Sequence, residues 1–297
     1  MPAARGLLHR AAVLSAIPKP NEFRTHQQTA AAGAAVMRAL GLTADSVDQL
    51  QTLPLERVTA ATGAAMQALD LYIGPSVDGQ TIPAAPFNSV APQISVDVQL
   101  LIGTTRDEGS PITNPARENM TSIELREEAQ KLHGTQSQAL LAALTAVYPR
   151  ATPVELFGHV RPSGGLDMRV HAVEQATRKS EQRAANVYLY EFAWHTPVLS
   201  GRPRAFHRSE IPFIFANTDR CAQLTGGTEE ARVLAGRMTD AWVHFARTGD
   251  PNHRHLPRWP SFTPAGVETM VFDEVCAVER DQDRLARLAY RAAMKAS

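Results

Sequence analysis

Two stretches of this chain contain nearly continuous apolar runs, and they constrain the fold more than any other feature. Residues 96–104 read Val-Asp-Val-Gln-Leu-Leu-Ile-Gly-Thr, with a nearly continuous apolar run at the centre. Residues 187–194 read Val-Tyr-Leu-Tyr-Glu-Phe-Ala-Trp and are rich in aromatic and β-branched side chains. Such runs are typical of strands in a parallel sheet that is covered on both faces.

Helical patterns separate these strands along the chain. The spacing of apolar residues, with Gly and Pro as stops, predicts helices over residues 27–41, 45–50, 54–69, 121–148 with a break near Gly134, 171–184, 229–247 and 283–295. Residues 7–16 read as the end of a helix running into a short strand, and residues 270–273 as a final edge strand. This alternation predicts an α/β fold with a mainly parallel sheet and helices on both faces. Because no linker interrupts it, we expect a single domain over residues 1–297.

Charge and composition exclude several classes of function. The chain has 30 Lys and Arg against 30 Asp and Glu, so it has no basic surplus for nucleic acid or an anionic membrane. It contains no run of 18 apolar residues, so we expect no membrane span. Residues 1–6 do not form a secretory signal, and two cysteines give no disulfide framework, so a cytoplasmic location is the default expectation.

An acidic turn and a later histidine supply the candidate catalytic residues. Asp107 and Glu108 directly follow the first strand, and His207 lies in a loop ahead of the apolar run 211–215. This is the order of the acid and the histidine in the Ser-acid-His triads of α/β-hydrolases. The acid would orient the histidine, and the histidine would transfer a proton as general base and then general acid. Spacing alone does not separate Asp107 from Glu108.

Each of these residues also has a non-catalytic interpretation. A strand-end Asp-Glu-Gly is most often a solvated turn, and a single loop histidine is more often structural than catalytic. A nucleophile elbow requires Gly-x-Ser-x-Gly on a strand-to-helix turn. Ser76, within the turn-rich stretch from Tyr72 to Gly79, and Ser163 do not fit that pattern, so we interpret both as ordinary turn residues.

Three other groups of polar residues are further candidates for a functional role. His253 and His255 lack further ligands at metal-binding spacing, so we expect no metal and no cofactor. Glu210 is either a buried acid behind His207 or a polar turn residue. The remaining group consists of loop arginines that we expect to be solvated: Arg202, Arg204 and Arg208.

Three segments together resemble the type B carboxylesterases, the cholinesterase-like branch of the α/β-hydrolase fold. These are residues 101–109, 205–213 and 240–252, and the resemblance runs in family order over essentially all 297 residues. It implies that the triad acid is Glu108 and the triad histidine is His207. Thr105 departs from the family, where many members have asparagine.

A larger departure lies at the front of the chain. Residues 6–11, Gly-Leu-Leu-His-Arg-Ala, match a stretch that in the family follows shortly after the Gly-Glu-Ser-Ala-Gly elbow. The resemblance therefore implies the C-terminal part of an α/β-hydrolase domain, with the nucleophile serine, the oxyanion loop and the N-terminal strands missing.

The expected function follows from both parts of this resemblance. In the complete protein we expect hydrolysis of a small-molecule carboxylic ester by Ser-His-Glu acyl transfer. We expect the chain to be inactive alone, with the missing N-terminal half as its partner. The alternative is a non-catalytic fragment or binding module of the same fold. Retention of both Glu108 and His207 favours the esterase, since a binding module needs neither.

Overall fold

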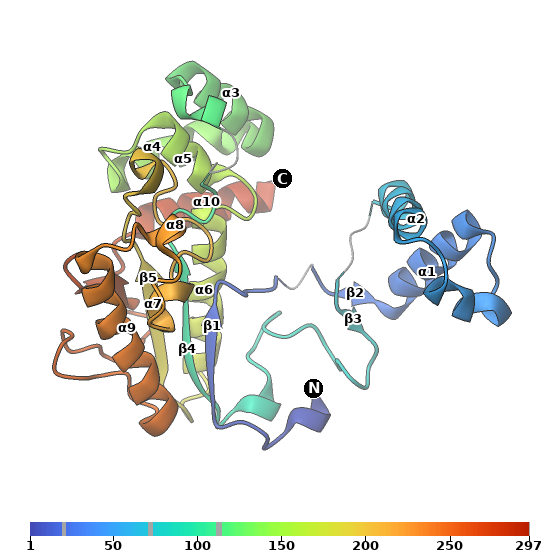
Figure 1. Ribbon diagram of the computed structural model, residues 1–297, viewed down its shortest axis with the longest axis horizontal. Coiled ribbons are helices and arrows are strands. Elements are labelled where there is room, and N and C mark those ends of the chain that lie inside the picture. Colours follow the sequence, from blue (N-terminus) through green and yellow to red (C-terminus); the bar gives the residue numbers. More distant parts are fainter. Residues whose placement is uncertain (20–21, 71–73, 111–114, 297) are drawn as a thin grey trace. The chain divides into compact units, whose positions relative to one another are not determined.

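The structure, a computed structural model, describes residues 1–19, 22–70, 74–110 and 115–296. The chain forms two compact units, coloured along the sequence in Figure 1. The smaller unit contains Met1–Leu7 and Pro18–Ile94, and the larger contains Leu8–Ile17 and Ser95–Ser297. The expectation of one domain over residues 1–297 stays a prediction.

The smaller unit is a helical pair with a two-stranded ribbon. Helix α1 (His26–Leu40) packs against α2 (Leu55–Ala68), and β2 (Arg24–Thr25) pairs in parallel with β3 (Ser76–Val77). Both predicted helices are confirmed, and the predicted helix at 45–50 is a 3₁₀ helix, Ala44–Gln51. In the predicted turn-rich stretch, Tyr72 and Ile73 lie outside the described residues.

The larger unit is built on a five-stranded sheet in the order β1-β4-β5-β6-β7. Its first four strands are mutually parallel, as predicted, and the last is antiparallel. Their bounds are β1 Arg10–Leu14, β4 Gln99–Thr105, β5 Val187–Phe192, β6 Glu268–Phe272 and β7 Ala277–Arg280. The prediction of an edge strand at 270–273 is wrong, because β7 pairs with β6 and covers its outer side.

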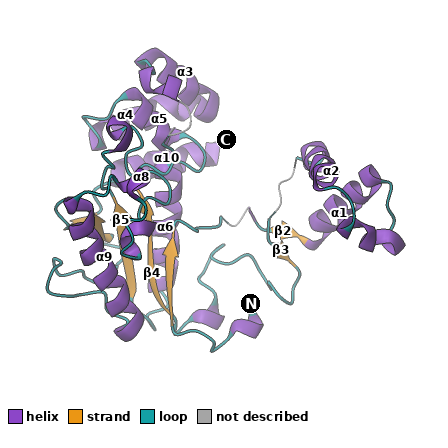
Figure 2. Cartoon of the chain, viewed as in Figure 1, coloured by secondary structure: helices purple, strands orange, loops and turns teal. Residues whose placement is uncertain are grey.

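Alternate residues of β4 and β5 face different helical layers, which explains their continuous apolar sequences. Leu100, Ile102 and Leu189 belong to a core that includes Ala172 and Val173 of helix α6 (Gly165–Ser180). Leu101, Tyr188, Tyr190 and Phe192 belong to an aromatic core with helices α7 (Ile211–Ile214) and α9 (Glu229–Thr248). Figure 2 shows the strands between α6 and α9, so both faces of the sheet are covered.

A third core lies among the remaining large helices of this unit. It joins residues of α6 with α3, α4, α5 and the last helix, α10. The bounds of these helices are α3 Ser122–His133, α4 Ser137–Val147, α5 Pro153–Val160 and α10 Arg284–Ala296. The short helix α8, Ala222–Thr225, contributes no residue to this core. The pattern did not predict α5, because Pro153 reads as a breaker although it occupies the first helical turn, where proline is accepted. Among the described residues, no helix is long and apolar enough to cross a membrane.

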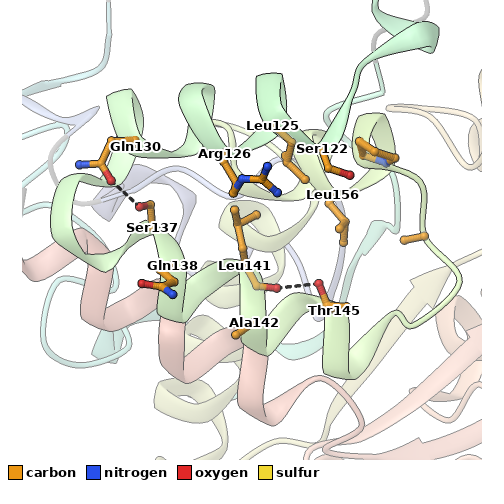
Figure 3. Close-up of a pocket in the computed structure, with 12 residues that line it drawn as sticks. Ser122, Leu125, Arg126, Gln130, Ser137, Gln138, Leu141, Ala142, Thr145 and Leu156 are labelled. Atoms are coloured by element: carbon orange, nitrogen blue, oxygen red, sulfur yellow. Dashed lines mark hydrogen bonds between the residues drawn. The ribbon is translucent and has the colours of Figure 1, made fainter.

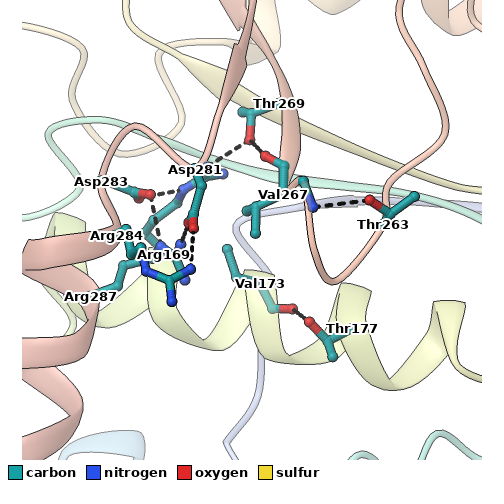
Figure 4. Close-up of polar contacts among 11 residues, drawn as sticks. Arg169, Val173, Thr177, Thr263, Val267, Thr269, Asp281, Asp283, Arg284 and Arg287 are labelled. Atoms are coloured by element: carbon teal, nitrogen blue, oxygen red, sulfur yellow. Dashed lines mark hydrogen bonds and ion pairs between the residues drawn. The ribbon is translucent and has the colours of Figure 1, made fainter.

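Helix α6 begins six residues before the predicted start at residue 171. The apolar pattern did not indicate this earlier start, because the buried face of the helix carries charged side chains. Arg169 is 3% exposed, and its side chain bonds Asp283 (2.9 Å) and the Thr269 hydroxyl (2.8 Å), as Figure 4 shows. Asp283 also accepts from Arg287 of α10 (2.7 Å). Burial alone would raise the pKa of Asp283, but the two arginines hold it below its ordinary value. This ion network fastens α10 to α6 and to the sheet.

We predict that Asp283→Asn destabilises the larger unit by about 3–5 kcal/mol, because it leaves two buried guanidinium groups without their shared carboxylate. Urea unfolding followed by circular dichroism measures the change. Arg284→Ala is the matched control, because Arg284 reaches the same turn through Asp281 but its side chain is 66% exposed. We expect the control to change stability by about 0.5 kcal/mol or less. Equal effects of the two variants would contradict the structural role of Asp283.

Candidate active site

Glu108 lies in the turn after β4, and both of its carboxyl oxygens are occupied by donors. Oε1 accepts hydrogen bonds from the Ser15 hydroxyl and from the Thr105 backbone N–H (2.8 Å). Oε2 is bonded to Nδ1 of His207. The Glu108 side chain is 1% exposed. A carboxylate held by three donors from three segments has one orientation, which makes it a fixed acceptor for the histidine.

His207 lies in the turn that leads into α7, and its side chain remains 47% exposed. Because the Glu108 carboxylate can only accept, Nδ1 of His207 carries the proton of this bond and Nε2 is the nitrogen free to take one. The hydrogen bond to Glu108 raises the pKa of His207 above its ordinary value of 6.5, although burial opposes this. The structure thus brings together the two predicted site residues in the geometry of a general base and its orienting acid.

Asp107 has a different structural role from Glu108. Its backbone N–H donates to the Ala205 carbonyl (3.0 Å), and its Oδ2 accepts from the Ala205 N–H (3.2 Å). The same carboxylate lies 3.5 Å from Nε2 of His195. Burial alone would raise the pKa of Asp107, but His195 and other neighbouring cations hold it below its ordinary value. Asp107 therefore fixes the backbone two residues before His207 and does not contact the imidazole of His207.

The loop that leads to His207 is closed at its base. The Thr196 N–H donates to the Arg204 carbonyl (3.4 Å), so the intervening residues 197–203 form a loop between fixed ends. Arg204 is 7% exposed and bonds Glu155 (2.8 Å) and Glu118 (3.0 Å). The prediction that Arg204 is solvated is wrong, because two acids from separate segments reach it.

The other residues considered from sequence lie elsewhere or have local roles. Ser76 lies on β3 of the smaller unit and accepts a hydrogen bond from the Thr29 hydroxyl (3.0 Å). The backbone N–H of Ser163 donates to Asp167 (2.8 Å) at the start of α6. Within the described part of the chain, no three His, Cys, Asp or Glu side chains are grouped as metal ligands.

Sequence reasoning missed Ser15. It follows β1, is buried, and has a left-handed backbone with φ of 55°. Its hydroxyl donates to Glu108 and not to His207, so it orients the acid and is not placed as a nucleophile. A serine at the carboxyl end of a neighbouring parallel strand was the available signal, because such ends meet at one edge of a sheet.

A surface hollow of about 530 Å³ lies among α3, α4 and α5 (Figure 3). Leu125, Leu141 and Leu156 form its apolar part, and Arg126 and Gln138 contribute polar groups. Neither Glu108 nor His207 lines it. It therefore does not serve as the binding pocket of the acid–histidine pair.

The fold and the paired residues define an α/β protein of the hydrolase type, and comparison with known proteins gives the family. The model of the carboxylesterase family matches residues 1–285, so the chain belongs to that family. It is 28% identical over 290 residues to para-nitrobenzyl esterase of Bacillus subtilis (strain 168), covering 95% of this chain and 56% of the relative. It is 32% identical over 310 residues to phenmedipham hydrolase of Pseudarthrobacter oxydans, covering 98% of this chain and 59% of the relative.

Solved structures agree with this family and confirm the predicted fold class. An esterase from anaerobic Clostridium hathewayi, described as able to hydrolyse aliphatic aromatic polyesters, matches with a TM-score of 0.75 and 27% identity, over 98% of this chain and 58% of that one. A thermophilic PNB esterase matches with a TM-score of 0.72 and 28% identity, over 98% and 59%. The chain thus has the α/β-hydrolase fold and spans less than two thirds of the length of these relatives.

The Glu108–His207 bond predicts a measurable pH dependence. Because folding raises the pKa of His207, the pair stabilises the fold fully below pH 6.5 and loses this contribution as pH rises through the raised value. In Glu108→Gln we expect the His207 titration midpoint, followed by NMR of its ring protons, to fall toward 6.5. His195 is the internal control, since its pKa is raised by Asp107 and should not move. An unchanged His207 midpoint would contradict the bond.

Two substitutions at Asp107 separate its anchoring role from its charge. Asp107→Ala leaves the buried Ala205 N–H without its side-chain acceptor, and we expect a loss of about 1–3 kcal/mol. The hydrogen-bonded ring N–H resonance of His207 should broaden as the loop loosens. Asp107→Asn keeps an oxygen for Ala205, so the His207 resonance should persist while the His195 titration midpoint falls. Loss of the His207 resonance in both variants would show that charge, not anchoring, holds the loop.

Proposed function

We propose that this chain supplies the acid, Glu108, and the general base, His207, of a Ser-His-Glu hydrolase acting on carboxylic esters. The observation that carries the proposal is the hydrogen bond from His207 Nδ1 to a buried and fully bonded Glu108. Membership of the carboxylesterase family supports it, and so do the relatives named as esterases. The name of the relative para-nitrobenzyl esterase makes p-nitrobenzyl esters a reasonable first substrate class to test.

The chemistry assigned to the pair is ordinary acyl transfer. His207 Nε2 takes the proton of a serine hydroxyl as the serine oxygen attacks the ester carbonyl. The resulting imidazolium is stabilised by the Glu108 carboxylate, and it then gives the proton to the departing alcohol. A water molecule, activated by the same nitrogen, hydrolyses the acyl-serine and releases the acid. Glu108 keeps the ring in the required tautomer throughout.

The nucleophile belongs to a part of the protein that these 297 residues do not include. No Gly-x-Ser-x-Gly occurs in the sequence, and the Ser15 hydroxyl donates its hydrogen bond to Glu108. In the part of the chain that the structure describes, strand β1 is the end strand of the sheet, and its residues are partly exposed. An edge of this kind accepts a further strand. We therefore propose an N-terminal polypeptide carrying the elbow as the partner, joined in one chain or assembled in trans.

We predict that the 297-residue chain alone does not hydrolyse a short-chain p-nitrophenyl ester and is not labelled by a fluorophosphonate probe. Loss of the serine of a triad lowers kcat by about 10⁶-fold, and loss of oxyanion donors lowers it further. Spectrophotometric release of p-nitrophenol measures turnover, with His207→Ala as the control for adventitious hydrolysis. Turnover by the chain that disappears in His207→Ala would refute this prediction.

The positive test starts from the DNA upstream of the Met1 codon. An in-frame Gly-x-Ser-x-Gly there identifies the partner segment, and the extended protein should hydrolyse the ester. In it, Glu108→Gln and His207→Ala should each reduce kcat by about 10⁴-fold or more. An extended, folded protein that retains full activity in both variants would overturn the assigned roles.

A further inference from the structure

The surface hollow among α3, α4 and α5 takes no part in the chemistry above. It lies between two helical faces whose lining residues are spaced by three or four positions: Ser122, Leu125 and Arg126 of α3, and Gln138, Leu141 and Thr145 of α4. The Ser137 hydroxyl donates to the Gln130 side chain (2.8 Å) and so ties the two helices together at one end of the hollow. Leu156 of α5 lies at the other end (Figure 3). The hollow is therefore a bounded recess of about 530 Å³.

The floor of this recess is the outer side of the core that joins α3, α4, α5 and α10. Leu125 and Leu156 belong to that core, and Leu141 packs against it while staying partly exposed. An alkyl or aryl group placed over these three leucines would remove apolar surface from water on both sides. Concave apolar surface with a few polar groups at its rim is the usual form of a small-molecule site.

The rim of the recess supplies one uncompensated positive charge. Arg126 is the charged residue among those that line it, and in the described part of the chain its guanidinium has neither an ion pair nor a hydrogen bond. Figure 3 shows its side chain lying between α3 and α4. Two other polar side chains of the lining are already bonded, since the Thr145 hydroxyl donates to the Leu141 carbonyl (2.9 Å) and Gln130 accepts from Ser137.

No carboxylate lines the recess in the described ranges of the chain. The nearby acids are held by other partners. Glu124 accepts from the Thr121 N–H (2.7 Å), Glu128 pairs with Lys131 (2.8 Å), and Glu155 pairs with Arg204 (2.8 Å). The charge at the rim is thus complemented by an anion from outside, whereas a cation there would meet only the guanidinium.

We propose that the recess is a binding site for a small carboxylate with an apolar body. The carboxylate pairs with the Arg126 guanidinium, whose planar fork of N–H groups fits two carboxylate oxygens at once. The Ser122 hydroxyl, one helical turn before Arg126 on the same face, offers a further donor. The apolar body covers Leu125, Leu141 and Leu156. This site goes beyond the proposed function, because it involves neither Glu108 nor His207 and exists whether or not the chain hydrolyses an ester.

The test titrates sodium octanoate into the isotope-labelled full chain and follows its backbone amide signals by NMR. Signals of lining residues in α3, α4 and α5 should shift and saturate, and those of α1 should stay in place. Arg126→Gln should weaken octanoate binding by about tenfold or more. Lys131→Gln is the matched control, because Lys131 is a cation of the same helix that is 69% exposed and does not line the recess. It should change the affinity by about twofold or less.

Two further probes separate the charge from the apolar contact. Octanol has the same apolar body without the charge, and it should bind the unaltered chain about as weakly as octanoate binds Arg126→Gln. Octylammonium, with the opposite charge, should bind more weakly than octanol. Octanoate shifts that do not saturate or lie outside the recess would overturn the proposal. So would equal affinities for octanoate and octylammonium, or equal losses in Arg126→Gln and Lys131→Gln. Both substitutions are at exposed helical positions, and circular dichroism verifies that the variants are folded.

Discussion

The candidate site depends on the three hydrogen bonds that converge on the Glu108 carboxylate. One comes from the residue after β1, one from the last residue of β4, and one from the His207 turn almost one hundred residues later. Their donors come together because β1 and β4 are adjacent and parallel, so that their carboxyl ends meet at one edge. The acid is thus held by the sheet itself, and the histidine takes its orientation from the acid. Asp107 adds a second tie by joining the same strand end to the backbone of Ala205.

That strand end is in turn fixed by burial on both faces. Leu100 and Ile102 pack toward α6 while Leu101 packs toward the aromatic core under α9. A register slip of one residue would exchange these two sets, so the position of the turn after β4 is strongly determined. Gly103 contributes through its size, because a Cβ there would lie 2.3 Å from the Tyr190 ring. The Arg169–Asp283–Arg287 network fastens the last helix to the same layer.

Much of this could be predicted from the sequence, and the failures have physical reasons. Continuous apolar runs predicted β4 and β5, because burial on both faces leaves a strong signal in residue type. Chain order indicated an acid and His207. Spacing could not separate Asp107 from Glu108, because adjacent residues at a strand end point to different sides and the sequence does not show which side faces the histidine. Ser15 was missed because its role depends on strand order. The early start of α6 was missed because its buried face carries Arg169, whose partner lies more than one hundred residues away. The family resemblance, confirmed by the comparisons, supplied what periodicity could not.

The closed base of the loop before His207 has a consequence for how such proteins diverge. Thr196 bonds Arg204 across the neck, and Arg204 and Ala205 are each held by acids from other segments. The exposed side chains among residues 197–200 can therefore change while the histidine stays in register with Glu108, whereas Pro203 is buried and the Arg202 carbonyl accepts a hydrogen bond from Arg204. Leu199, which is 58% exposed on this loop, is free to be replaced. Evolution can in this way alter the surface beside the site without disturbing the proton-transfer geometry, and a laboratory library confined to the exposed positions of this loop could do the same.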